Sequence, residues 1–286
     1  MFDFGNANDA QKLAISSSNG AVLITAGPGT GKTFTLVQRA IYLIQECGVK
    51  PEQILMATFT EKAAKELVTR ITNELAVRNI YVNVNEMYIG TFHSLCLRII
   101  KDNLEFTQLK KNYRLLDSFD QKYLVFRNIQ KFRNIADIEL VMPNGGAWKW
   151  AEAICGLVGT LTEELVDADA MAKDSKTEIR VLSAILKQYQ QLLTDENLID
   201  FAKIQTECYR LLKENPAILS DLQEKIHYLM IDEYQDTNYA QYVLTSLLAG
   251  YYENICVVGD DDQSIYKFRG ATIENILSFE NEFKGC

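Results

Sequence analysis

Several features that would assign this chain to a particular class of protein are missing from its sequence. No apolar run approaches the roughly 18 residues of a membrane-spanning helix, so we expect no membrane partner. Residues 1–5 contain neither a basic region nor a long apolar region, so no secretory signal is visible. The chain contains only two histidines, His93 and His227, which argues against a histidine-rich metal site.

Cysteine is present without the spacing of a disulfide framework or a zinc site. The six cysteines are scattered, and none forms a Cys-x-x-Cys pair. We therefore expect reduced thiols and a cytoplasmic protein.

The length and composition are those of an ordinary globular protein. A chain of 286 residues with 48% apolar residues allows one large domain or two smaller ones. The net charge of −9 argues against binding nucleic acid, but local patches steer binding more than the total does. Residues 101–133 hold eight Lys/Arg and four Asp/Glu, whereas residues 134–175 hold two Lys and eight Asp/Glu. Either stretch alone is also compatible with a solvated face.

The most informative stretch is a glycine-rich loop between an apolar run at residues 21–24 and a helical pattern at residues 34–44. Its sequence is Ala26-Gly27-Pro28-Gly29-Thr30-Gly31-Lys32-Thr33. This order predicts a phosphate-binding loop, in which backbone N–H groups and the helix N-terminus surround an anion. Lys32 would reach the β- and γ-phosphates of ATP, and the Thr33 hydroxyl would bind Mg²⁺. The strict pattern begins with glycine where this chain has Ala26, so a glycine-rich turn without a ligand is the alternative.

An acidic pair supplies the partner that such a loop requires. Residues 226–231 form an apolar run, predicted to be a buried strand, and Asp232 and Glu233 follow it. Asp232 would hold Mg²⁺, directly or through water, and Glu233 would accept a proton from the attacking water. Without the loop, an acidic turn would be the better interpretation.

Strands alternate with helices in the first hundred residues, which predicts a parallel α/β sheet with its sites at the carboxyl ends of the strands. Two such ends set hydroxyl groups beside aromatic rings, and they read Thr58-Phe59-Thr60 and Thr91-Phe92-His93. Hydroxyls suit phosphate contacts and rings can stack on bases, although helix caps and a core ring are the alternative. Earlier in the chain, Gln11 could read adenine with its amide or be an exposed helical residue.

The α/β pattern is interrupted by a helical region and then resumes. Residues 105–223 show helical spacing and no phosphate or metal signature, which predicts a helical insertion. A last strand at residues 255–260 precedes Gln263, which is placed to sense the γ-phosphate. Tyr266, Phe268 and Arg269 then interleave rings and charge, a pattern that favours single-stranded nucleic acid.

Taken together, these stretches resemble the N-terminal part of superfamily 1 DNA helicases of the UvrD/Rep type. The matching stretches are residues 8–11 (adenine-reading motif), 26–33 (motif I), 58–64 (motif Ia), 90–94 (the next DNA-contacting motif), 231–238 (motif II) and 258–271 (motif III). Alanine is common at the first position of motif I in this family. Ala7 and Phe268 depart from the usual Leu and Trp.

The resemblance implies an ATP- and Mg²⁺-dependent DNA helicase or translocase, and it implies a role for several residues. Gln11 and Arg39 would contact the base region of the nucleotide. A second set would face single-stranded DNA, and it comprises Phe59, Thr91, His93, Tyr266 and Phe268. Arg269 would connect that track to Gln263. Residues 1–104 and 224–286 would form the RecA-like subdomain 1A, and residues 105–223 the helical subdomain 1B.

The sequence ends before the stretches that would match the family's motifs IV to VI and its 2A and 2B subdomains. In the family, ATP lies between 1A and 2A, and 2A supplies arginine fingers. We therefore expect this polypeptide alone to bind nucleotide weakly, to hydrolyse it poorly and not to unwind duplex DNA, with single strands and single-strand/duplex junctions as partners. The alternatives are a natural nucleotide- or DNA-binding module without turnover, and part of a nuclease-coupled recombination helicase.

Overall fold

The computed structural model describes residues 2–260 and 274–286, which divide into two compact units. The first unit contains residues 1–96 and 212–286, and the second contains residues 97–211. The chain crosses from one unit to the other within α4 (Phe92–Asp102) and returns within α10 (Phe201–Glu214). The sequence analysis placed these boundaries at residues 104 and 223.

The first unit is built around a parallel sheet with the strand order β1-β7-β6-β2-β3. The strands are β1 (Val22–Thr25), β2 (Ile54–Thr58), β3 (Tyr88–Thr91), β6 (Tyr228–Ile231) and β7 (Ile255–Gly259). The helices are α1 (Asp9–Ser16), α2 (Lys32–Gln45), α3 (Glu61–Val77), α11 (Pro216–Lys225), α12 (Tyr239–Ala249) and α13 (Glu274–Glu282), with 3₁₀ turns η1 (Pro51–Gln53), η2 (Val84–Glu86) and η5 (Tyr234–Asp236). The expected α/β fold with a parallel central sheet is confirmed.

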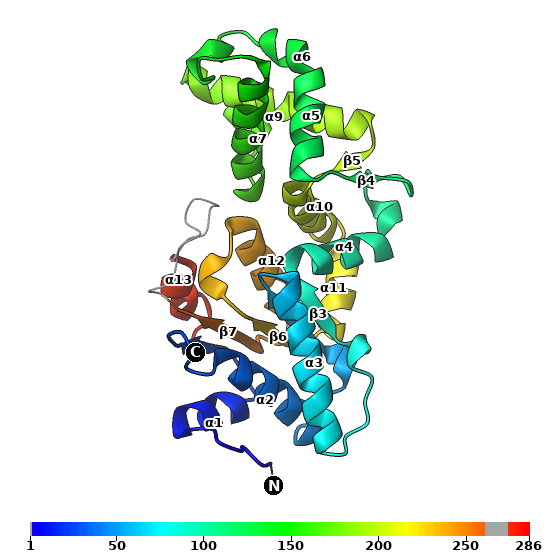
Figure 1. Cartoon of the computed structure of the whole chain (residues 1–286), viewed down its shortest axis with the longest axis vertical. Coiled ribbons are helices and arrows are strands. Elements are labelled where there is room, and N and C mark those ends of the chain that lie inside the picture. The colour runs from blue at the N-terminus through cyan, green and yellow to red at the C-terminus, as the bar shows by residue number, and fades with distance from the viewer. Residues whose placement is uncertain (1, 261–273) are drawn as a thin grey trace. The chain divides into compact units, whose positions relative to one another are not determined.

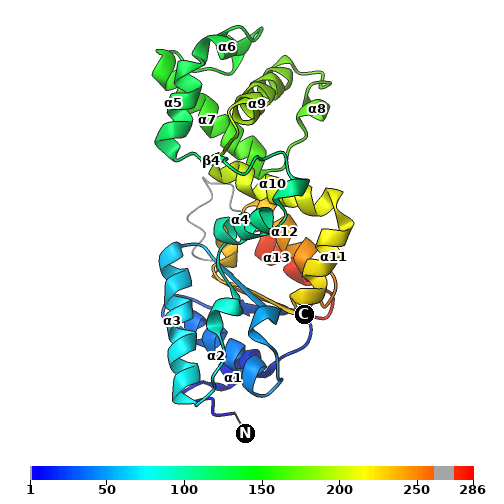
Figure 2. The ribbon, with the colours of Figure 1, turned by 90° about the vertical axis from the view of Figure 1, so that its right-hand side faces the viewer.

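Helices cover both faces of the sheet (Figures 1 and 2), which explains why most residues of its strands are apolar and buried. Ile54 and Met56 of β2 join the core formed with α1, α2 and α3, whereas Leu55 and Ala57 join the core formed with α12 and α13. Alternate residues of one strand thus bury against opposite layers. All five strands are parallel, so their carboxyl ends meet at one edge.

The second unit is helical, with a separate core. It contains α5 (Ser118–Arg127), α6 (Ile129–Arg133), α7 (Ala147–Glu163), α8 (Ala168–Met171) and α9 (Thr177–Asp195), the 3₁₀ turns η3 (Leu104–Phe106) and η4 (Ile138–Leu140), and the short parallel strands β4 (Arg114–Leu115) and β5 (Leu198–Ile199). The sequence predicted one helix over residues 119–132. The structure ends α5 at Arg127, because the next residue, Asn128, leaves helical geometry at φ −104° and ψ 16°.

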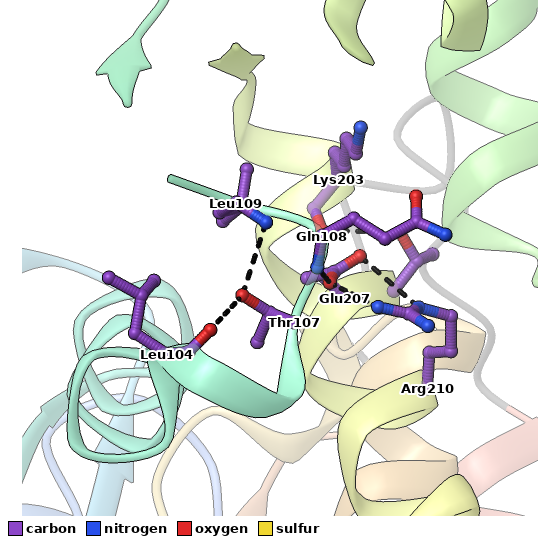
Figure 3. A network of polar contacts seen from close by, with 8 residues as sticks. Leu104, Thr107, Gln108, Leu109, Lys203, Glu207 and Arg210 are labelled. Carbon is purple, nitrogen blue, oxygen red and sulfur yellow. Dashed lines mark hydrogen bonds and ion pairs between the residues drawn. The ribbon is translucent and has the colours of Figure 1, made fainter. Parts of the chain in front are cut away.

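Two buried polar networks tie the helices of this unit together. In the first, the Tyr189 hydroxyl donates to Asp200 Oδ2 at 2.5 Å, and the Gln121 amide donates to the same oxygen at 3.1 Å. In the second, Glu207 accepts from the Arg210 guanidinium at 2.6 Å and from the Gln108 backbone at 3.4 Å (Figure 3). Each network gives a buried carboxylate the donors that burial requires.

No helix among the described residues is both long enough and apolar enough to cross a lipid bilayer.

Candidate nucleotide-binding and catalytic site

The glycine-rich loop connects β1 to α2 as the sequence predicted. Gly29 and Gly31 have φ values of +71° and +89°, which residues with a side chain rarely adopt. The Thr30 hydroxyl donates to the Gly27 carbonyl at 2.7 Å and closes the turn. The Ala26 N–H donates to the Gly259 carbonyl of β7 at 3.0 Å, so the start of the loop is fixed to the neighbouring strand.

Gln11 is bound to this loop through its side-chain amide. Its Nε2 donates to the Thr30 carbonyl at 3.0 Å, and its Oε1 accepts from the Asn8 N–H at 2.9 Å. A Cβ added at Gly31 would lie 2.8 Å from Nε2. Glycine at this position therefore permits both the backbone conformation and the close approach of the amide.

A cavity of about 380 Å³ lies beside the loop and the first helix. Its lining comprises Asn8, Ala10, Gln11, Ala14, Ile24, Thr25, Ala26, Gly27, Thr30, Lys32 and Thr35. Its lining includes two amide side chains, one ammonium group and several small apolar surfaces, a combination that suits a nucleoside phosphate. Another cavity, of about 230 Å³, lies in the helical unit and includes Glu207 and Arg210, but it has no loop of this kind.

Arg39 does not belong to the lining of the cavity beside the loop. Only 1% of its surface is exposed, and its Nη1 donates to the Ala14 carbonyl at 2.5 Å. The guanidinium thus anchors the last turn of α1 against α2. A contact with a nucleotide base would require this buried group to move, and the predicted contact of Arg39 with the base stays a prediction.

The acidic end of β6 reaches the loop across the end of β7. Because β7 lies between β1 and β6 in the sheet, the loop and the acidic pair flank Gly259. Lys32 Nζ lies 3.5 Å from Glu233 Oε2, and the Lys32 side chain is only 10% exposed. The structure therefore brings together the two residues on which the predicted phosphate chemistry depends.

The carboxylates at this end of the sheet are held in an unfavourable environment for negative charge. Burial raises the pKa of Asp232 to about 6, and the neighbouring Glu233 carboxylate adds to the shift. Burial and Glu233 also raise the pKa of Asp236 to about 6. The backbone N–H of Glu233 donates to Asp232 Oδ1 at 3.0 Å. Glu233 itself has φ +53°, a strained conformation for a residue with a side chain.

The described residues contain no group of three or more His, Cys, Asp or Glu side chains that could hold a metal ion by themselves. Mg²⁺ does not need such a group, because it is usually bound by one or two protein ligands together with phosphate oxygens and water. A buried carboxylate with a raised pKa, such as Asp232, fits this kind of cation site. Thr33 lies in the first turn of α2, directly after Lys32.

The Thr60 and Thr91 hydroxyls, near the ends of β2 and β3, are engaged within the protein. Thr60 caps α3 by accepting from the Ala63 N–H at 3.1 Å, and Thr91 accepts from the Ser94 N–H at 3.1 Å. The Thr91 hydroxyl also donates to Glu61 Oε1 at 3.0 Å. These contacts are the helix caps that the sequence analysis gave as the alternative, and they still leave part of Thr60 exposed.

Rings occur at the same two strand ends. Phe92 is half-buried against the core beneath α12 and α13, and Phe59 is half-buried after β2. Burial lowers the pKa of His93, which favours its neutral form.

The remaining predicted residues, Gln263, Tyr266, Phe268 and Arg269, lie outside the described residues.

One residue of the site received no role from the sequence. Gln235 is 2% exposed and contacts Glu233 directly. Its position two residues after Glu233, in the polar stretch at residues 232–238 that follows β6, was the available signal.

Comparisons with known proteins identify the family to which this sequence belongs. The sequence model described as UvrD/REP helicase N-terminal domain matches residues 7–284. The chain belongs to the UvrD/Rep helicase family. It is 36% identical over 279 residues to the ATP-dependent DNA helicase PcrA of Staphylococcus epidermidis, covering 97% of this chain and 36% of that protein. It is 36% identical over 277 residues to PcrA of Bacillus subtilis, covering 96% of this chain and 36% of the relative. The chain therefore spans about a third of the length of these relatives.

Proposed function

We propose that this chain is the ATP- and single-stranded-DNA-binding part of an ATP-dependent DNA helicase or translocase. The observation that carries the proposal is the approach of Lys32 to Glu233 at 3.5 Å, between a phosphate-binding loop and an acidic strand end. The names of the relatives, which are ATP-dependent DNA helicases, support the same activity for the protein to which these residues belong.

The proposed nucleotide site follows from the loop and the strand ends. Residues 27–31 surround the phosphates, Lys32 binds the β- and γ-phosphates, and Gln11 fixes the loop near the base. MgATP supplies the phosphoanhydride bond and the cation that neutralises its phosphates, and Thr33 and Asp232 are the residues that would hold that cation. Glu233 accepts the proton of the attacking water, and Gln263 senses the γ-phosphate.

We further propose that single-stranded DNA binds across the ends of β2 and β3. Phe59, Thr60 and His93 offer a ring, an exposed hydroxyl and an imidazole there, with Thr91 and Phe92 supporting them from beneath. Tyr266, Phe268 and Arg269 would extend this track. Movement in the 3′→5′ direction, a preference for single-strand/duplex junctions, and a cytoplasmic location come from the family resemblance alone.

The isolated 286 residues should bind ATP weakly and turn it over slowly. In the family a second RecA-like subdomain completes the nucleotide site, and an arginine finger contributes on the order of 10³–10⁵ in rate. We propose that such a subdomain is the partner of this chain in the working protein.

The deciding experiment is an ATPase assay with and without single-stranded DNA, on these residues and on a longer polypeptide of the same protein. We expect DNA-stimulated hydrolysis by the longer polypeptide, abolished by Lys32→Ala, and little hydrolysis by the 286 residues. Duplex unwinding by the 286 residues alone would contradict the proposal. Nucleotide binding without turnover in any longer polypeptide would favour a binding module instead.

A further inference from the structure

Gln235 connects the proposed catalytic base to the neighbouring strand through both ends of one amide group. Its Nε2 donates to Glu233 Oε2 at 2.7 Å, and its Oε1 accepts from the Asp260 N–H at 3.0 Å. These partners fix the orientation of the amide. In the reversed orientation, a carbonyl would face the carboxylate and an NH₂ group would face the N–H.

The end of β7 is shaped to receive this side chain. A Cβ added at Gly259 would lie 2.9 Å from Gln235 Oε1, so a larger residue there would displace the amide. Gln235 is 2% exposed, whereas the Glu233 side chain is 37% exposed. A buried, doubly bonded amide therefore holds a much more exposed carboxylate.

The contacts of Glu233 are unequal between its two carboxylate oxygens. Both the Gln235 amide and the Lys32 ammonium approach Oε2, at 2.7 and 3.5 Å. Holding Oε2 orients the carboxylate and makes Oε1 the oxygen that can accept a proton. Once Lys32 turns to the phosphates, the Gln235 bond is the contact that keeps this orientation.

We propose that Gln235 is a positioning residue that holds Glu233 for proton transfer and links it to the backbone at Asp260. The proposal rests on the proposed role of Glu233 as the base. Asp260 directly precedes the stretch that contains Gln263 and the predicted DNA-contacting residues. A backbone shift at Asp260 would reach Glu233 through one side chain, so Gln235 also couples DNA binding to hydrolysis.

The test uses a polypeptide of this protein that shows DNA-stimulated ATPase activity. Gln235→Met keeps the length of the side chain and removes both hydrogen bonds. Gln235→Glu keeps the acceptor for Asp260 and replaces the donor with a second carboxylate facing Glu233. Gln241→Met is the matched control, because Gln241 is also buried, at 5% exposure, and lies on α12.

We expect both Gln235 variants to lower the single-turnover rate of hydrolysis by about 10- to 100-fold, the usual cost of a misplaced general base. The dissociation constant for a non-hydrolysable ATP analogue should change by less than about threefold, and the ratio of DNA-stimulated to basal turnover should fall. The Gln241→Met variant should resemble the wild type. If Gln235→Met does not fold, Gln235→Glu carries the same comparison.

A double variant separates positioning from a general structural role. If Gln235 acts through Glu233, adding Gln235→Met to Glu233→Gln should leave the residual rate unchanged, because residues that act as one unit are not additive. A further loss of more than about threefold would overturn the proposal, as would normal turnover by Gln235→Met. Normal turnover by Glu233→Gln alone would instead refute the assignment of the base, which is a separate failure.

Discussion

The contact between Lys32 and Glu233 must break when a nucleotide binds, and this makes a measurable prediction. Lys32 Nζ lies 3.5 Å from Glu233 Oε2. The same ammonium group is the proposed ligand of the β- and γ-phosphates. Removing the charge of Glu233 should therefore release Lys32 and strengthen the binding of ATP.

The size of the effect follows from the geometry of the pair. At 3.5 Å and an effective dielectric constant of about 20, the Coulomb attraction is about 5 kcal/mol. Most of this is lost to solvent, because 37% of the Glu233 side chain is exposed, and measured pairs of this kind contribute up to about 1 kcal/mol. One kcal/mol corresponds to about a fivefold change in affinity.

We therefore expect Glu233→Gln to bind a non-hydrolysable ATP analogue about fivefold more tightly than the wild type, while hydrolysis is lost. Calorimetric titration at low salt measures the affinity directly, and the gain should shrink as salt screens the pair. Glu61→Gln is the control, because it also removes one carboxylate charge, but from a side chain that contacts Thr91 at the end of β3. In a Lys32→Met background the gain should disappear. Unchanged or weaker binding by Glu233→Gln would refute the competition between carboxylate and phosphate.

Three further predictions concern the loop, the acidic strand end and the helical unit. Gly31→Ala should abolish nucleotide binding in calorimetry and destabilise the protein by about 1–2 kcal/mol, because φ is +89° and the new Cβ would lie 2.8 Å from the Gln11 amide. Gly27→Ala, whose Cβ would meet no atom within 4 Å, should cost little stability, and it serves as the control for stability alone because Gly27 belongs to the proposed phosphate loop. The raised pKa of Asp232, about 6 against 3.8, means that the folded protein binds this proton more tightly than the unfolded chain does. The free energy of unfolding without nucleotide should thus fall by up to about 3 kcal/mol as pH rises from about 4 through 6, and urea titrations of Asp232→Asn should lack that part of the slope. Tyr189→Phe removes a 2.5 Å hydrogen bond to a buried carboxylate and should cost about 1–3 kcal/mol in urea unfolding, with ATP affinity unchanged.

The elements that position the site were predictable because each has a strong local signal. Strands β2 and β7 are buried at every position, since both faces of the sheet are covered, and all but the last residue of β2 are apolar. The loop was predictable from its glycines, because two of them have positive φ values that residues with a side chain rarely adopt. By contrast, α12 was not predicted, since its buried face includes Gln241 and Thr245 beside Leu244, which weakens the apolar periodicity.

Side-chain roles were harder to predict than elements, because they depend on contacts distant in sequence. The burial of Arg39 depends on the Ala14 carbonyl of α1, which no pattern within α2 reveals. Gln11 was predicted to contact the adenine base, but the use of both its amide atoms within the protein follows from tertiary packing. The break after α5 depends on the conformation of Asn128, a residue that helices otherwise tolerate.

The distribution of charge around the loop supports the proposal that a divalent cation accompanies the nucleotide. Asp232, Glu233 and Asp236 lie at one strand end, and Lys32 is the cation paired with them among the described residues. Burial and mutual repulsion already raise the pKa of two of these carboxyls to about 6. The phosphates of ATP would add further negative charge beside them and would take Lys32 from Glu233. The carboxylates would therefore make this end of the sheet unfavourable for ATP alone, and a cation held there by Asp232 would offset that repulsion.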